Sequence, residues 1–125
     1  MKDDRVLLTH ILKEMAFLKK ICRGRSSDDL LQDDYFSHAA IRAIEVIGEA
    51  SKSISPALKA RHPEIDWREM AGMRDYVIHR YFEINWNIVW DVISNEIPVL
   101  EPKIASMLQN LDTGAGTNFQ SNDKT

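Results

Sequence analysis

Residues 35–54 read YFSHAAIRAIEVIGEASKSI, and the prediction of the fold starts from their helical pattern. Its apolar side chains recur every three or four positions, as along one face of an α-helix: Phe36, Ala40, Ala43, Ile47, Ala50 and Ile54. Ile41, Ile44 and Gly48 widen this face and leave a narrow polar stripe opposite it: His38, Arg42, Glu45, Glu49 and Lys52. A helix with so wide an apolar face needs neighbours on two sides. The pattern therefore predicts a helical bundle and is a first indication of a dimer.

A long helix is predicted before this stretch, and shorter structure after it. The first helix runs roughly from Asp4 to Cys22, and Gly24 is its natural stop. Ser55-Pro56 has the pattern of a helix cap followed by proline at the first helical position, which opens a short turn. The polar residues between the first helix and residue 35 are expected to connect the two long helices.

Two further helices are predicted in the second half of the chain. Asp66 and Glu69 have the spacing of a capping box, and the helix they begin is expected to run to about Phe82. Asn85 is the expected cap of the last helix. Pro98 is expected to kink this helix, and Pro102 is a second candidate for a bend.

The sequence thus predicts an all-α domain over residues 1–111, built as an antiparallel bundle of four main helices plus short helices. No strand-like alternation and no internal repeat is visible in it. Residues 112–125 have almost nothing to bury and are expected to form a disordered tail. The three tryptophans, at positions 67, 86 and 90, are expected to pack in the core rather than to stack on bases.

Composition excludes several classes of protein. The net charge of −3 does not suit a general nucleic-acid coating protein, so any RNA contact requires a local basic patch. The single cysteine, Cys22, cannot form an internal disulfide and is expected to be a small core residue. No apolar run approaches a membrane span, and the N-terminus does not look like a signal peptide. A cytoplasmic protein is expected.

Arg74 and His79 lie five residues apart on one predicted helix and are therefore about 140° apart around its axis. Arg74 falls on the apolar face with Met70 and Val77, where a charge is costly unless it is paired. Spacing alone favours a structural role, in which Arg74 pairs with Glu45 or Glu49 and His79 is solvated. Asp75 is four residues before His79, so it can orient the imidazole and favour its protonated form.

The segment GMRDYVIHRYF, residues 72–82, resembles the arginine–histidine signature of the HEPN superfamily. Tyr81, two residues after His79, makes the segment similar to the HepT branch, whose motif is R-x4-H-x-Y. Supporting resemblances lie outside the motif, and together they cover nearly everything from Asp3 to Leu111: residues 41–50, 61–67 and 88–91. One position departs from the pattern, because Arg80 stands where a small residue, often glycine, is expected.

This resemblance implies a homodimeric, metal-independent ribonuclease with catalytic Arg74, Asp75 and His79 in a composite site at the dimer cleft. His79 can act as acid or base near neutral pH, and Arg74 can hold phosphate oxygens in bidentate fashion. One histidine per chain leaves a second proton-transfer role unfilled, which a twofold dimer would supply. The histidines are scattered without the spacing of metal ligands, so neither a metal nor a cofactor is expected.

The resemblance also implies a toxin that acts on RNA, transfer RNA among the candidates, and that is held in check by an antitoxin. In HepT-like proteins the motif tyrosine, here Tyr81, accepts AMP from a partner nucleotidyltransferase of the MntA type. Two helical turns separate Tyr81 from Arg74, so its phenol is expected on the same face; the plainer interpretation is a core tyrosine. The alternative function is a non-catalytic HEPN subunit that binds nucleotides or serves as an adaptor of a nucleotidyltransferase. A purely structural bundle would leave Arg74 unexplained.

Five cations are candidates for binding the RNA backbone: Arg80, Lys19, Lys20, Arg23 and Arg25. Four of them cluster where the first helix ends. Cations at a helix C-terminus are favourable without any ligand, so a solvated helix end is the plainer interpretation of that cluster.

Overall fold

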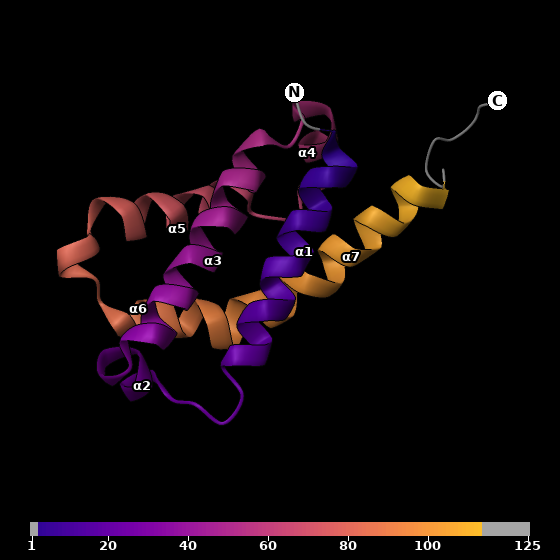
Figure 1. Ribbon diagram of the computed structural model, residues 1–125. Helices are drawn as coiled ribbons and strands as arrows, with labels where there is room; N and C mark the ends of the chain where they lie inside the picture. Colours follow the sequence, from indigo (N-terminus) through magenta and orange to yellow (C-terminus); the bar gives the residue numbers. More distant parts are fainter. Residues whose placement is uncertain (1–2, 114–125) are drawn as a thin grey trace.

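The computed structural model describes residues 3–113, and every element in that range is helical (Figure 1). The elements in chain order are α1 Asp4–Ile21, α2 Ser27–Gln32, α3 Asp34–Ser53, α4 Pro56–Arg61, α5 Trp67–His79, η1 Tyr81–Glu83, α6 Trp86–Asp91, η2 Val92–Glu96 and α7 Ile97–Thr113. The all-α class is confirmed for these residues. Helix α7 continues to Thr113, two residues into the predicted tail, and the rest of that tail lies outside the described residues.

Helix α3 lies in the middle of the molecule, between α1 and α5, and α7 packs on α1 (Figure 1). All six residues of the predicted seam, from Phe36 to Ile54, are buried, and so are Ile41, Ile44 and Gly48. The wide apolar face of α3 therefore finds its two neighbours, α1 and α5, within one chain. That face no longer argues for a dimer, although the dimer itself stays a prediction.

Side-chain caps fix the helix ends as the sequence suggested. The Asp66 carboxylate accepts the backbone N–H of Glu69 at 2.9 Å, which is the first half of the predicted capping box. Ser55 caps α4, and its own N–H and hydroxyl donate to the Asp4 carboxylate at 2.9 and 2.6 Å, so the start of α1 is tied to the end of α3. Gly24 has φ +70°, the left-handed conformation expected where the chain leaves α1.

Two expectations about helices were wrong. The segment before α3 contains the short helix α2, capped by Ser26 and Asp29, where only a connection was predicted. Helix α5 ends at His79 rather than near Phe82. The chain reverses after it, and the N–H of Asn85 donates to the Tyr76 hydroxyl at 2.9 Å, which holds the reversed chain against the last turns of α5.

The last predicted helix is interrupted before Pro98, as expected. Residues Val92–Glu96 form a π-helical turn, in which the N–H of Ile97 bonds the carbonyl of Val92. A proline ring clashes with the carbonyl four residues earlier, here that of Ser94, so a wider turn at this place relieves the clash. Helix α7 then runs through Pro102 and packs along α1 (Figure 1).

The remaining expectations about packing hold. Trp67 is buried and donates its indole N–H to the carbonyl of His62 at 3.3 Å, while Trp86 and Trp90 pack against the core half-buried. Cys22 is half-buried at the end of α1, and burial raises the pKa of its thiol to about 11. None of the helices within residues 3–113 combines the length and apolar character that crossing a membrane requires.

Candidate active site on helix α5

Gly48 lets helices α3 and α5 approach closely at the point where Arg74 begins. A Cβ atom placed on Gly48 would overlap the Cβ of Arg74 and come within 3.1 Å of the Met70 carbonyl oxygen. No side chain larger than hydrogen fits there unless α5 moves. The crossing therefore fixes where the Arg74 side chain leaves the backbone.

Two carboxylates hold the Arg74 guanidinium. Its Nε lies 2.9 Å from Oε1 of Glu49 on α3, and its Nη1 lies 3.0 Å from Oδ1 of Asp75. The side chain is 27% exposed, so the charge is paired yet reachable from solvent. The ion pair of Arg74 with Glu49 is one of the two that spacing suggested. Asp75 is engaged with Arg74, and no hydrogen bond between it and His79 is found in residues 3–113.

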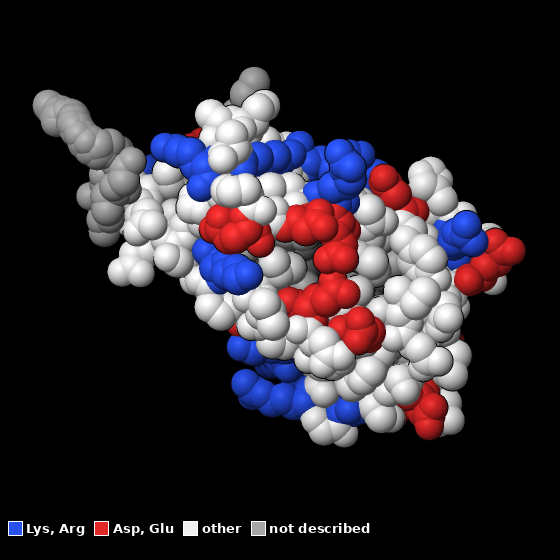
Figure 2. Space-filling model, turned by 180° about the vertical axis from the view of Figure 1, so that it is seen from behind, with Lys and Arg blue, Asp and Glu red and all other residues white. Residues whose placement is uncertain are grey.

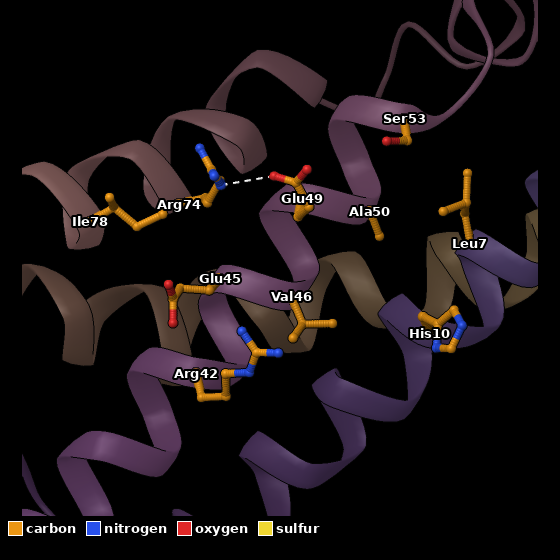
Figure 3. Close-up of a pocket in the computed structure, with 10 residues that line it drawn as sticks. All are labelled: Leu7, His10, Arg42, Glu45, Val46, Glu49, Ala50, Ser53, Arg74 and Ile78. Carbon is orange, nitrogen blue, oxygen red and sulfur yellow. Dashed lines mark ion pairs between the residues drawn. The ribbon is translucent and has the colours of Figure 1, made fainter. Parts of the chain in front are cut away.

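Arg74 lines a cleft of about 600 Å³ between α1, α3 and α5 (Figure 3). Its walls come from all three helices: Leu7, His10, Arg42, Glu45, Val46, Glu49, Ala50, Ser53, Arg74 and Ile78. In Figure 3 Arg74 reaches from α5 toward Glu49 across the opening, and His10 stands on the opposite wall, on α1. Three residues of the polar stripe predicted on α3 thus line a charged cleft, which can hold a polar ligand: Arg42, Glu45 and Glu49.

His79 is exposed at the last position of α5, where the helix dipole favours a cation. It is not among the residues that line the cleft. One chain therefore places Arg74 in the cleft and His79 outside it, as the 140° separation around the helix requires. Residue spacing predicted this separation correctly.

Tyr81 does not lie where the sequence placed it. Helix α5 ends before it, so two turns of helix cannot be counted from Arg74, and Tyr81 instead begins the 3-10 turn η1. Tyr81 is 47% exposed, and its ring packs edge-on against Phe82, with 5.3 Å between the ring centroids. Its hydroxyl oxygen lies 3.2 Å from Nε2 of His38 on α3. The prediction missed His38, because nothing local in the sequence links residues 43 positions apart.

The proposed RNA-binding cations are only partly available. Lys19 forms an ion pair with Glu101 at 2.7 Å, and Arg25 pairs with Asp33 at 2.8 Å while lying over the ring of Phe36. The hydrogen bond from Arg25 lowers the pKa of Asp33. The remaining three cations of the predicted set are exposed: Lys20, Arg23 and Arg80.

An acidic cluster lies where α5 meets the π-helical turn. Separately, the face of the molecule shown in Figure 2 carries a band of acidic side chains. Burial raises the pKa of Glu96 to about 7, and so do a hydrogen bond with Glu69 and the charges of Glu69, Asp91 and Asp66. In the described chain no group of three or more His, Cys, Asp or Glu side chains is placed to hold a metal ion.

These features define a small all-helical protein in which one helix presents an arginine in a charged cleft and an exposed histidine beside it. The family model described as "Ribonuclease HepT-like" matches residues 11–107. The chain therefore belongs to the HepT-like ribonuclease family of the HEPN superfamily.

Curated relatives align with most of the chain. A protein of Caldanaerobacter subterraneus subsp. tengcongensis named "Putative RNase" is 41% identical over 109 residues, 87% of this chain and 97% of the relative. "Probable ribonuclease HepT" of Thermococcus cleftensis is 40% identical and covers 85% of this chain and 96% of its own. A further "Putative RNase", of Methanocaldococcus jannaschii, is 34% identical and covers 89% and 92%. No solved structure matches this chain significantly.

Proposed function

We propose that this protein is a metal-independent ribonuclease that cleaves RNA with Arg74 and His79. The observation that carries the proposal is the R-x4-H-x-Y segment of a HepT-like chain, folded so that Arg74 lines a charged cleft and His79 stands exposed on the same helix. Names of relatives such as "Probable ribonuclease HepT" support the same activity.

The chemistry needs only groups that the chain possesses. A base takes the proton of a ribose 2′-hydroxyl, whose oxygen attacks the neighbouring phosphorus, while an acid protonates the leaving 5′ oxygen. His79 can serve in either role. Arg74, positioned by Glu49 and Asp75, neutralises the charge that develops on the phosphate oxygens.

A homodimer completes this scheme, because each chain supplies one exposed motif histidine and the reaction needs two proton-transfer groups. Apolar side chains exposed next to His79 suit an interface there: Ile78 is 37% and Phe82 is 95% exposed. RNA would approach away from the band of acidic side chains in Figure 2, which repels phosphate. Arg80 and the exposed cations Lys20 and Arg23 are then available to contact the RNA backbone.

In the cell, this ribonuclease would be the toxin of a cytoplasmic toxin–antitoxin pair. A partner nucleotidyltransferase of the MntA type would add AMP to Tyr81 and so silence the toxin. Tyr81 is accessible enough for such a reaction, with about half of its surface exposed. A phosphate and an adenosine added at the end of α5 would block the approach of RNA to His79 without unfolding the protein.

The test is cleavage of labelled RNA by purified protein in the presence of EDTA. His79→Ala is expected to lower the rate by roughly 10²–10⁴-fold, the usual contribution of a general acid or base, and Arg74→Ala to abolish cleavage. His62→Ala is the matched control, because His62 lies outside the motif and pairs with Glu64. Undiminished cleavage by either motif variant, or a strict need for a divalent ion, contradicts the proposal.

One observation favours the second candidate function, a non-catalytic HEPN subunit that binds nucleotides. The cleft that Arg74 lines has a volume of about 600 Å³, within the range of small-molecule pockets, and His79 does not line it. The same assay separates the two functions. Wild-type protein that leaves every RNA intact but binds ATP in calorimetry, with loss of binding in Arg74→Ala, indicates the binding subunit.

A further inference from the structure

The hydroxyl of Tyr81 belongs to a chain of hydrogen bonds that begins in the first turn of α3. Its oxygen lies 3.2 Å from Nε2 of His38, and Nδ1 of His38 lies 2.7 Å from the carbonyl oxygen of Asp34. The turn η1 thus brings Tyr81 back against α3, next to His38, which lies 43 positions earlier in the sequence. The topology alone creates this pair.

The Asp34 carbonyl determines which atoms of His38 and Tyr81 carry the protons of these two hydrogen bonds. A carbonyl oxygen can only accept a hydrogen bond, so Nδ1 of His38 must hold the hydrogen between them. In the neutral imidazole, Nε2 then carries the lone pair, and the Tyr81 hydroxyl donates to it. The phenolic proton therefore already points at a nitrogen that can accept it, with the ring fixed from the far side by a carbonyl.

The other tyrosines of the chain have different surroundings. The Tyr76 hydroxyl accepts a hydrogen bond from the N–H of Asn85. Tyr35 lies on α3, only three positions before His38, and is 92% exposed. Among residues 3–113, Tyr81 is the tyrosine whose hydroxyl bonds a histidine nitrogen, and its ring remains half-exposed to a reagent.

We propose that His38 is the general base that activates Tyr81 for transfer of AMP from ATP. The proposal rests on the adenylylation of Tyr81 proposed above and adds a catalytic group from this chain. The phenolic oxygen attacks the α-phosphorus as its proton passes to Nε2 of His38. The new bond joins oxygen to phosphorus, the bond between the α-phosphorus and the bridging oxygen breaks, and pyrophosphate leaves with the electron pair. The imidazolium then stands beside the new phosphodiester and later loses its proton to water.

The first experiment measures the reactivity of Tyr81 without any partner enzyme. Benzenesulfonyl fluoride sulfonylates activated phenols: oxygen bonds to sulfur, fluoride leaves, and the proton goes to the base. Labelling is followed at each tyrosine by peptide mass spectrometry. Tyr81 is expected to react faster than the more exposed Tyr35, and His38→Ala to slow Tyr81 by about 10²-fold, the lower end of general-base contributions.

Two controls separate a base from a packing residue. Added imidazole is expected to restore labelling of Tyr81 in His38→Ala, because the small base can occupy the vacated space; a lost packing contact is not restored in this way. His62→Ala is the matched histidine variant and should label like the wild type. Circular dichroism spectra that coincide among all variants show that the fold is unchanged. If Tyr81 labels no faster than Tyr35, or if His38→Ala labels at the wild-type rate, the proposal is overturned.

The second experiment measures AMP transfer from ATP by the proposed partner, a nucleotidyltransferase of the MntA type, using intact-protein mass. His38→Ala is expected to slow the gain of AMP at Tyr81, and imidazole to restore it. An unslowed gain of AMP overturns the role of His38. If no AMP reaches Tyr81 while benzenesulfonyl labelling still depends on His38, the proposed adenylylation fails and the activated tyrosine stands.

Discussion

At the scale of single residues, a glycine on α3 determines the position of the guanidinium on α5. Gly48 faces Arg74 and Met70 so closely that a methyl group does not fit between the helices. Gly72 lies on α5 itself, and a Cβ added to it meets nothing within 4 Å. An added methyl group would therefore clash at Gly48 and meet open space at Gly72, so the same substitution at Gly72 is a matched control for Gly48.

Gly48→Ala is expected to destabilise the protein by about 1–3 kcal/mol, the usual cost of an added group in a close-packed interface, and to lower RNA cleavage because α5 must shift. Gly72→Ala is expected to stabilise it by roughly 0.5–1 kcal/mol, since alanine favours the helix. Urea unfolding and the RNA cleavage assay measure both effects. Equal stability of the two variants would show that the helix crossing does not need Gly48.

Asp75 gives a second prediction at this scale. Because it accepts a hydrogen bond from Arg74 at 3.0 Å, it positions the guanidinium rather than the imidazole. Asp75→Asn keeps an acceptor oxygen and is expected to lower cleavage only a few-fold, whereas Asp75→Ala is expected to lower it by about tenfold. Comparing cleavage rates of the two variants across pH tests this role. A shift in the pH profile with Asp75→Asn would return Asp75 to the partnership with His79 that the sequence suggested.

At the scale of elements, the spacing of residues along one helix was predicted correctly, whereas the contacts of Tyr81 with a distant segment were not. The spacing of Arg74 and His79 depends on α5 alone, and the structure keeps it. Tyr81 was misplaced because the end of α5 depends on the Asn85–Tyr76 hydrogen bond, a contact made across a turn. His38 could not be predicted as a partner of Tyr81 either, because this contact also depends on how the chain turns after α5. The break before Pro98 was predictable because a proline acts on its own helix.

The junction of α5 with the π-helical turn should make stability depend on pH. Glu96 has a pKa raised from its ordinary 4.5 to about 7, so the folded state holds this proton more tightly than the unfolded chain does. Its contribution is fully present below about pH 4.5 and is lost as the pH rises through about 7. Glu96→Gln removes the charge and is expected to reduce the loss of stability as the pH rises. At pH 8 it should raise Tm by roughly 4 °C, the shift that about 1 kcal/mol produces in a domain of this size.

Thermal unfolding followed by circular dichroism from pH 5 to pH 8 measures this difference. Glu83→Gln, which removes a carboxylate from the turn η1, is the control and should leave the slope unchanged. A wild-type Tm that stays flat between pH 5 and pH 8 would show that the cluster of Asp66, Glu69, Asp91 and Glu96 does not strain the fold.

At the scale of the whole molecule, the argument for a dimer rests on exposed residues at the end of α5 and not on the apolar face of α3. The apolar face of α3 is covered by α1 and α5 of its own chain, so it asks for no partner. One chain leaves the proposed catalytic pair divided: Arg74 lies in the cleft, and His79 lies outside it on an exposed helix end. A twofold axis near the end of α5 would bring two histidines together beside the exposed Ile78 and Phe82.

Mixing subunits tests whether two histidines share one site. In a composite site, a dimer of one wild-type chain and one His79→Ala chain is inactive. RNA cleavage should then fall with the square of the wild-type fraction, to about a quarter in an equal mixture. Independent sites make cleavage fall linearly, to about half. The chains are exchanged by dilution and reconcentration, and light scattering must show a dimer at micromolar concentration. A linear fall, or a monomer in light scattering, rules out the composite site. Neither result changes the separate test of Arg74 and His79, which is the loss of RNA cleavage in the Arg74→Ala and His79→Ala variants.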